Sequence, residues 1–293
     1  MSCEKFKTIN FQAAALARIE QAREILRDPE YADTRLTLRQ LYYQFVSRNL
    51  ITNEEKSYKN LAGLISDARL AGLINWDAIE DRGRVPTIPL EFTSLRHRVD
   101  SAIANYRLPR WEGQETYAEL WVEKQALAGV LEPLAHEFHV TLVVNKGYSS
   151  SSAMYDASKR FLDACGNCER EPRLFYLGDH DPSGEDMVRD IRERLELFGV
   201  EGIKVEKVAL TTAQVRQYNP PPNPAKMTDS RAAAYVAIHG RRSWEVDALP
   251  PTVLTRLVRA AFRRIIDRPM MDAVIEEEER GKAALLEATR TVT

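Results

Sequence analysis

The chain has 293 residues, a formal net charge of −2, 44% hydrophobic residues and 29% charged residues. These values are ordinary for a globular protein and allow one large domain or two modest ones. No apolar run approaches the length of a membrane span, and the N-terminus lacks the pattern of a signal peptide. The composition therefore argues against a membrane protein and predicts a cytoplasmic location.

The charge is unevenly distributed along the chain. Between residues 35 and 110 there are twelve Lys and Arg against eight Asp and Glu, whereas the C-terminal part is acidic and includes the run from Glu276 to Glu279. The overall charge excludes a strong bulk attraction to nucleic acid. A locally basic N-terminal module can still bind DNA.

Three helices and two short strands are predicted in the first third of the chain. We expect one helix over 11–26, a second after a capping box formed by Thr37 and Gln40, and a third capped by Ser57 and ended by Gly72. Strands are expected over 74–79 and 85–88. This is the order of a winged helix, in which the third helix and the hairpin face DNA.

Basic side chains on the third helix and at the tip of the hairpin are candidates for contacts with the DNA backbone. For each of them, a solvated basic face is the alternative interpretation. The candidates in this region are Lys59, Arg69, Arg82 and Arg84.

Beyond a helix over 93–106 and a linker over 108–114, the pattern changes to alternating strands and helices. Strands are predicted over 117–122, 140–145, 173–178 and 204–210, which is typical of an α/β domain with a parallel sheet. The proline-rich stretch 219–224 is expected to be an exposed loop, and helices are expected from residue 230, over 252–266 and at the C-terminus. We therefore divide the chain into a domain over 1–112 and an α/β domain over 113–293.

Acidic residues follow two of the predicted strands. Glu123 comes after the first strand, and Asp179-His180-Asp181 comes after the third. Carboxylates at the C-terminal ends of parallel strands share one crevice, and alternation puts both aspartates on one side and His180 on the other. Such a group of oxygen ligands suits Mg²⁺ or Mn²⁺ and phosphate chemistry. The alternative is that these are ordinary solvated loop acids.

The second predicted helix carries adjacent tyrosines. Tyr42 falls on the apolar face of this helix, whereas Tyr43 lies off that face, on the same side as Arg39. A guanidinium beside a phenol favours the phenolate and can hold a phosphate, as a tyrosine nucleophile requires. The alternative is that both tyrosines are structural.

Four motifs together resemble the Toprim domain of the topoisomerase VI A subunit family, which includes the meiotic double-strand-break transesterase and short bacterial and viral relatives without a B subunit. They are Glu123, the segment 146–149 (Lys-Gly-Tyr-Ser), the segment 179–184 (Asp-His-Asp-Pro-Ser-Gly) and the segment 244–249 (Trp-Glu-Val-Asp-Ala-Leu). Ser149 stands where the family usually has proline, and Ser183 stands where it often has an aromatic residue. The Arg-x-x-Tyr-Tyr motif that ends at Tyr43 extends the resemblance to residues 37–262.

The resemblance implies an N-terminal winged-helix domain followed by a Toprim domain, which is Rossmann-like with a parallel sheet and C-terminal helices. It implies that Tyr43 forms a 5′-phosphotyrosyl link to DNA with Arg39 as its companion. It also implies Mg²⁺ held by Glu123, Asp179 and Asp181. Glu123 is then a candidate general acid or base, and Lys146 a candidate contact to the DNA backbone.

The implied partners are double-stranded DNA and a second copy of the chain, with the tyrosine of one protomer acting at the Toprim site of the other. The sequence has no P-loop for ATP, so the need for a separate ATPase subunit stays open. Two other functions are compatible with these residues. One is a Toprim nuclease that uses water as the nucleophile, and the other is a non-catalytic winged-helix DNA-binding protein with an idle acidic site.

Overall fold

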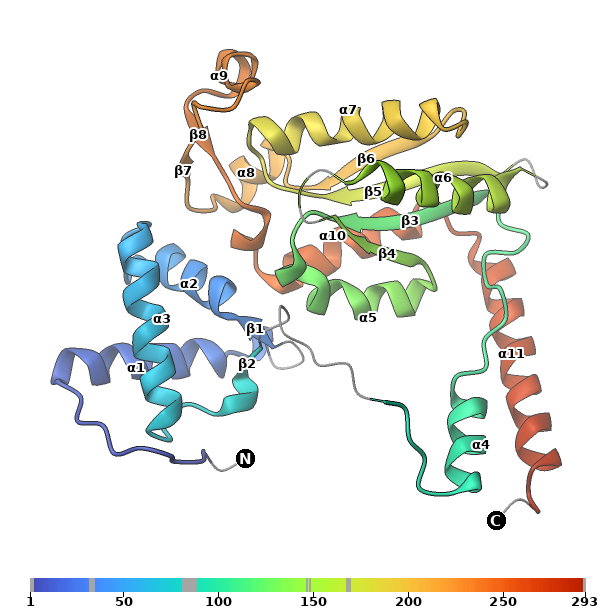
Figure 1. Cartoon of the computed structure of the whole chain (residues 1–293), viewed down its shortest axis with the longest axis horizontal. Coiled ribbons are helices and arrows are strands. Elements are labelled where there is room, and N and C mark those ends of the chain that lie inside the picture. The colour runs from blue at the N-terminus through green and yellow to red at the C-terminus, as the bar shows by residue number, and fades with distance from the viewer. Residues whose placement is uncertain are drawn as a thin grey trace.

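A computed structural model describes residues 3–31, 35–80, 89–145, 147, 149–166 and 170–291. The described part is a mixed α/β structure with an N-terminal helical unit, a parallel sheet covered by helices, and a helix pair made of a short helix, α4 (Leu95–Ala104), and the long C-terminal helix, α11 (Arg268–Ala288) (Figure 1). No helix in these ranges is both long enough and apolar enough to cross a membrane.

A four-stranded parallel sheet forms the centre of the larger unit. Its strands follow the order β4-β3-β5-β6. Val122 of β3 lies beside Val144 of β4 and Leu177 of β5, so these three strands end at the same edge. All four predicted strands are confirmed, and the two central strands carry the runs of buried side chains that are typical of a parallel sheet covered on both faces. The strands are β3 (Thr116–Val122), β4 (Thr141–Val144), β5 (Glu171–Leu177) and β6 (Lys204–Ala209).

Helices cover both faces of this sheet. On one face α5 (Ala128–Phe138) and α10 (Pro251–Arg263) pack with alternate strand residues such as Leu120 and Phe175. On the other face α6 (Ser151–Cys165) and α7 (Pro182–Leu197) pack with the intervening residues. This alternation along each strand gives the sheet two separate hydrophobic cores.

The N-terminal unit has its own core, built by three helices. The capping box of Thr37 and Gln40 is confirmed, and Gly72 ends the third helix region with a φ of 73°. Ser57 was wrongly predicted as the cap of the third helix. The cap position is Glu54, and the Ser57 hydroxyl is hydrogen-bonded to Thr52 Oγ1 at 2.8 Å instead. The helices are α1 (Ala13–Leu26), α2 (Leu38–Ser47) and α3 (Glu55–Leu70).

The hairpin expected after these helices differs from the prediction. Residues Trp76–Ala78 form a 3₁₀ turn, and only Ile79–Glu80 is extended, as β2. This short strand pairs in parallel with β1 (Leu36–Thr37). The expected tip at 81–84 and second strand at 85–88 lie outside the described residues.

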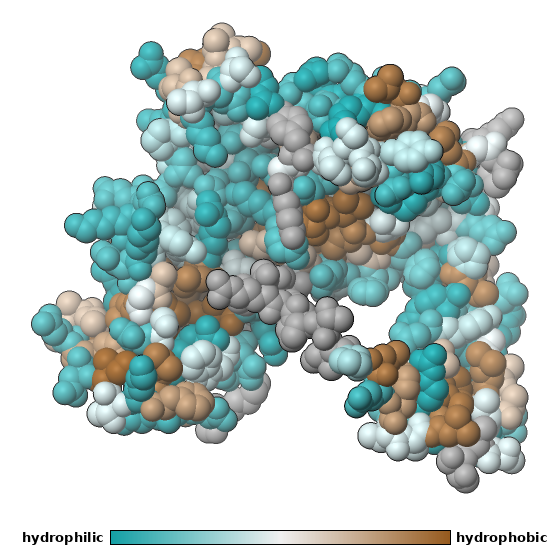
Figure 2. Space-filling model, viewed as in Figure 1, coloured by the Kyte–Doolittle hydropathy of each residue, from teal (hydrophilic) through white to brown (hydrophobic). Residues whose placement is uncertain are grey.

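The helix α4 (Leu95–Ala104), which we assigned to the first domain, packs against the second. It contacts α11 (Arg268–Ala288), and Arg96 donates a hydrogen bond to the carbonyl of Thr289 at 3.1 Å. No residue of α4 is fully buried. Figure 2 shows hydrophobic side chains gathered on this helix pair, where Leu95 and Leu286 are exposed.

The remaining elements close the sheet unit near the ends of its strands. The proline-rich stretch includes β7, which pairs with β8 in an antiparallel ladder, so it is not wholly an irregular loop. These elements are α8 (Thr212–Tyr218), β7 (Asn223–Pro224), α9 (Ala232–His239), β8 (Arg242–Ser243) and the 3₁₀ turn η5 (Val246–Ala248). Ala248 is buried in the core of the N-terminal unit, and α2 contacts η5, so this turn joins the two units.

Candidate active site

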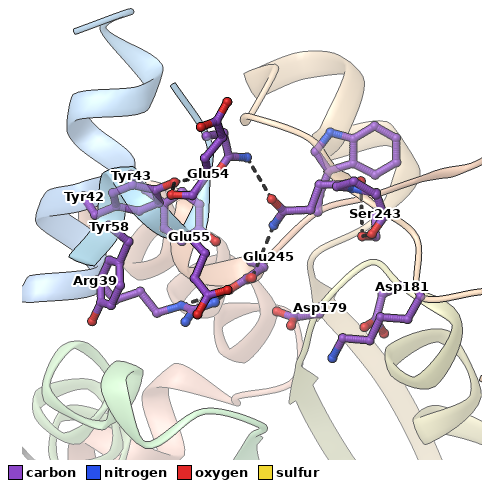
Figure 3. Close-up of a pocket in the computed structure, with 15 residues that line it drawn as sticks. Arg39, Tyr42, Tyr43, Glu54, Glu55, Tyr58, Asp179, Asp181, Ser243 and Glu245 are labelled. Carbon is purple, nitrogen blue, oxygen red and sulfur yellow. Dashed lines mark hydrogen bonds and ion pairs between the residues drawn. The ribbon is translucent and has the colours of Figure 1, made fainter. Parts of the chain in front are cut away.

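A pocket of about 340 Å³ lies where the N-terminal unit meets the ends of the sheet strands. Figure 3 shows tyrosines and Arg39 from α2 and α3 on one wall, and Asp179 and Asp181 on the other. The lining residues are Arg39, Tyr42, Tyr43, Asn53, Glu54, Glu55, Tyr58, Asp179, Asp181, Asn223, Pro224, Lys226, Ser243, Trp244 and Glu245. A single chain therefore brings the predicted tyrosines and both predicted aspartates to one pocket.

The expected placement of acids at neighbouring strand ends is confirmed. Glu123 follows β3 and donates its N–H to the carbonyl of Leu177 on β5 at 2.9 Å. Its Oε2 accepts the N–H of Asp179 at 3.1 Å. These backbone contacts hold Glu123 and Asp179 side by side at the edge of the sheet.

The turn after β5 is held in shape by its own residues. Asp181 is the N-cap of α7, with Oδ1 accepting the N–H of Gly184 at 2.7 Å. A Cβ at Gly184 would lie 2.1 Å from the carbonyl oxygen of Asp179, so only glycine fits this close approach. The sequence Asp-His-Asp-Pro-Ser-Gly thus has a structural role in forming the strand-to-helix turn, in addition to its role as a candidate site.

His180 lies apart from the pocket, as the alternation of side chains predicted. It is 1% exposed and forms two backbone hydrogen bonds with Trp244, at 2.8 and 3.0 Å. Its Nδ1 contacts Glu185, which also binds Lys207 Nζ at 2.7 Å. Lys207 donates a second hydrogen bond to the carbonyl of Asp179 at 2.6 Å, so His180, Glu185 and Lys207 position the acidic turn.

Lys124 contacts three carboxylates beside the pocket. Its Nζ lies 2.9 Å from Asp179 Oδ1, 2.7 Å from Glu245 Oε2 and 2.9 Å from Asp247 Oδ1. Burial lowers the pKa of Lys124, but these carboxylates raise it more, so the net shift is upward. The ammonium is therefore charged at neutral pH.

Arg39, from the N-terminal unit, binds two of these three carboxylates. Its guanidinium is hydrogen-bonded to Glu245 and lies 3.0 Å from Asp247 Oδ2. Burial raises the pKa of Glu245, but Lys124 and Arg39 lower it more, so this carboxylate is ionised. Arg39 thus links α2 to the sheet unit in this structure, in addition to lying near Tyr43.

The prediction that Tyr43 lies off the buried face of its helix is wrong. Tyr43 is only 3% exposed, because η5 packs over α2 and covers the side left open by the helical pattern. Burial raises the pKa of Tyr43, and Asp247 and Glu245 raise it further, whereas Arg39 lowers it. In this conformation the net effect opposes phenolate formation, contrary to the expected activation by Arg39.

Tyr42 is core-facing as predicted, and it is also tied to the pocket. It is 5% exposed, and its hydroxyl donates a hydrogen bond to Asn53 Oδ1 at 2.9 Å. Asn53 in turn donates to Asn223 Oδ1 and to the carbonyl of Pro222, both at 2.8 Å. The two tyrosines therefore differ in their partners rather than in their burial.

The three predicted metal ligands each use one oxygen within the protein. These are Glu123 Oε2, Asp179 Oδ1 and Asp181 Oδ1. Within the described ranges, their other oxygens have no hydrogen-bond partner, yet no three Asp, Glu, His or Cys side chains there are close enough to hold a metal together. Mg²⁺ is commonly held by one or two carboxylates, with water and phosphate oxygens as the other ligands. The residues fit that kind of site rather than a cage of three carboxylates.

The predicted DNA contacts are only partly described. Lys59 is exposed and pairs with Glu55 on the same helix. Arg69 lies over the Trp76 ring at 4.3 Å and donates to the carbonyl of Trp76 at 2.7 Å, so its role here is structural. Arg82, Arg84 and Lys146 lie outside the described residues.

Several residues of the site were not predicted as such. Lys124, Glu245, Asp247, Asn53 and Asn223 bring charge and amide groups to the pocket or its edge. Glu245 and Asp247 lie in the segment 244–249, whose resemblance to the family motif could have indicated that they belong to the site. Lys124 directly follows Glu123, but only the fold shows which carboxylates it contacts.

Comparison of the chain with protein-family models, curated proteins and solved structures finds no match. The function is therefore inferred from the geometry and chemistry of the pocket.

Proposed function

We propose that the protein is a DNA-cleaving transesterase of the kind represented by the topoisomerase VI A subunit, with a winged-helix unit and a Toprim unit. The observation that carries this proposal is the pocket in which Tyr42 and Tyr43 face Asp179 and Asp181. A tyrosine hydroxyl and acidic side chains suited to a cation are the groups that phosphodiester transfer needs.

Tyr43 is the nucleophile in this proposal. Its oxygen forms a bond to a backbone phosphorus, its proton passes to a base, and the bond from phosphorus to the 3′-oxygen breaks. The 3′-oxygen then takes a proton and leaves as a hydroxyl. Glu123 lies beside Asp179 but does not line the pocket with Tyr43, so its proposed role as general acid or base requires the site to rearrange when DNA binds. Because Tyr43 is buried, DNA reaches it only after the N-terminal unit moves away from Glu245 and Asp247.

One or two of the carboxylates of Asp179, Asp181 and Glu123 would hold Mg²⁺ or Mn²⁺ through an unpaired oxygen, with water and phosphate oxygens as the other ligands. When bound, the ion supplies positive charge to the phosphate and to the departing oxygen. Double-stranded DNA is the proposed substrate, and a second copy of the chain would cut the other strand. If the chain alone cleaves DNA but does not relax supercoils, a separate ATPase subunit is needed for strand passage.

A hydrolytic nuclease is the second candidate, and the burial of Tyr43 favours it. Burial and two nearby carboxylates raise the pKa of this tyrosine. Asp179 and Asp181 line the pocket, where a cation could activate water. In that reaction Tyr43 is structural and no covalent link forms.

Supercoiled plasmid separates these candidates. The protein is incubated with plasmid and Mg²⁺ or Mn²⁺, the reaction is stopped with SDS, and the products are run on gels with and without protease. A transesterase produces cut DNA that is retarded until protease is added, whereas a hydrolase produces cut DNA that protease does not change. Asp181→Asn is the matched control, because asparagine caps a helix as well as aspartate does. It should remove cleavage while α7 stays folded. Intact plasmid under all conditions would contradict both candidates.

A further inference from the structure

Lys124 occupies a position in which a cation would otherwise be expected. Its side chain is 20% exposed, and its three possible N–H donors face one oxygen each from Asp179, Glu245 and Asp247. These acids come from two distant parts of the chain, the end of β5 and the segment around η5. Lys124 is therefore the group that holds them together.

The spacing of the three oxygens suits an ammonium rather than a magnesium ion. They lie 2.7 to 2.9 Å from Nζ, which is the length of a charge-assisted hydrogen bond. Mg²⁺ needs oxygens at about 2.0–2.1 Å in nearly ideal octahedral geometry. The cluster would have to contract on every side to hold that ion in place of Lys124.

The charges of the cluster are nearly balanced without a metal. Arg39 binds Glu245 and Asp247, so two cationic side chains face three carboxylates. Asp247 is fully buried, and a buried carboxylate is stable only when it is paired. Lys124 and Arg39 thus supply the positive charge that the carboxylates of Glu245 and Asp247 need.

Asp179 joins this cluster to the proposed metal site. Its Oδ1 contacts Lys124 and the N–H of Val246, whereas it also lines the pocket with Asp181. A divalent ion on the pocket side of Asp179 would therefore have Lys124 as a neighbouring positive charge. That charge repels a second ion from Glu245 and Asp247.

We propose that Lys124 takes the place of a second metal ion, so that the site binds one divalent cation. Lys124 is then a positioning residue, which orients Asp179 and closes the Glu245 and Asp247 side to metal. The proposal rests on the metal site of the proposed function, but it concerns the number of ions and not the cleavage of DNA.

Titration of the full-length protein with Mn²⁺, without DNA, tests this proposal. Calorimetry and the electron paramagnetic resonance signal of free Mn²⁺ both report the number of bound ions. We expect one ion for the wild-type protein and two for Lys124→Met, which removes the charge but keeps the length of the side chain. Lys159→Met is the matched control, because Lys159 is an exposed residue that pairs with Asp156 on its own helix. It should bind one ion.

Glu245→Gln provides a second test that keeps Lys124 in place, and it serves if Lys124→Met does not fold. If Glu245 pairs with Lys124 and Arg39 and does not bind the metal, the Mn²⁺ affinity of Glu245→Gln should stay within about threefold of the wild type. Asp179→Asn should lower it by about tenfold or more, as expected for loss of a group close to the ion. A tenfold loss in Glu245→Gln, or one bound ion in folded Lys124→Met, would overturn the role of Lys124 and leave the proposed function intact. A wild-type protein that binds no Mn²⁺ would overturn the metal dependence of the proposed function as well.

Discussion

At the scale of single residues, Tyr42 and Tyr43 show how partners separate two side chains of the same type and similar burial. The Tyr42 hydroxyl donates a hydrogen bond to Asn53, and this bond helps to hold α2 to the start of α3. Tyr43 faces Asp247, Glu245 and Arg39, which act on its pKa in opposite directions. The chemistry proposed for Tyr43 therefore depends on where Arg39 and the two acids lie when DNA is bound.

Substitution of each tyrosine by phenylalanine should separate structure from catalysis. Tyr42→Phe should lower the free energy of unfolding by about 1 kcal/mol, because a buried hydrogen bond is lost, and it should keep cleavage activity. Tyr43→Phe should unfold at nearly the wild-type denaturant concentration, bind DNA and form no covalent adduct. Urea unfolding and the plasmid assay with SDS measure the two effects. Wild-type adduct formation by Tyr43→Phe would exclude this residue as the nucleophile.

At the scale of secondary-structure elements, α11 is held by one buried carboxylate. Glu278 is fully buried, with hydrogen bonds from Arg110 at 2.8 Å, Lys282 at 3.0 Å and the N–H of Leu108 at 3.1 Å. Burial raises the pKa of Glu278, but these contacts lower it more, to about 2. Glu278 thus joins α11 to the linker between α4 and the sheet.

The lowered pKa of Glu278 predicts a loss of stability in acid. Its contribution is fully present above the unfolded value of 4.5 and is lost as pH falls towards 2, because the folded state must then take up a proton. Glu278→Gln should cost about 3 kcal/mol near neutral pH, since Arg110 is left without its buried partner, and should flatten this part of the pH dependence. Glu279→Gln is the control, because Glu279 is exposed. Thermal unfolding between pH 2 and 7 measures both variants, and parallel curves for Glu278→Gln and the wild type would contradict the assignment.

At the scale of the whole molecule, the N-terminal unit and the sheet unit of one chain meet at the candidate site. Arg39 reaches Glu245 across 206 residues of sequence, and Asn53 reaches Asn223 across 170. The resemblance implied a site shared between two protomers, with tyrosine from one and acids from the other. In this structure both sets of residues belong to the same chain.

Mixing two inactive variants tells these arrangements apart. One variant carries Tyr43→Phe, and the other carries Asp179→Asn and Asp181→Asn. If the site acts within one chain, as the pocket indicates, mixed subunits should not restore cleavage, because every chain lacks one component. Plasmid cleavage by the mixture after exchange of subunits measures this. Recovery of about a quarter or more of wild-type activity would show that the tyrosine of one chain acts with the acids of another.

The sequence by itself determined the elements whose patterns are local. Buried strands, the capping box at Thr37 and the acidic turn after β5 were predictable, because periodicity, caps and glycine requirements act over a few residues. The placement of Glu123 beside Asp179 followed from the rule that parallel strands end at one edge.

Only the tertiary structure decided the environment of these residues. Tyr43 is buried because η5, about 200 residues later, packs on α2, and no helical pattern contains that information. Lys124 binds Glu245 and Asp247 across 121 and 123 residues, so its partners depend on how the segment after β8 returns to the sheet. Most of the strand expected over 74–79 is absent, because Trp76–Ala78 form a 3₁₀ turn before the chain reaches β1 at Ile79. Local patterns specify elements, whereas burial and charge pairing arise from packing between segments that are distant in sequence.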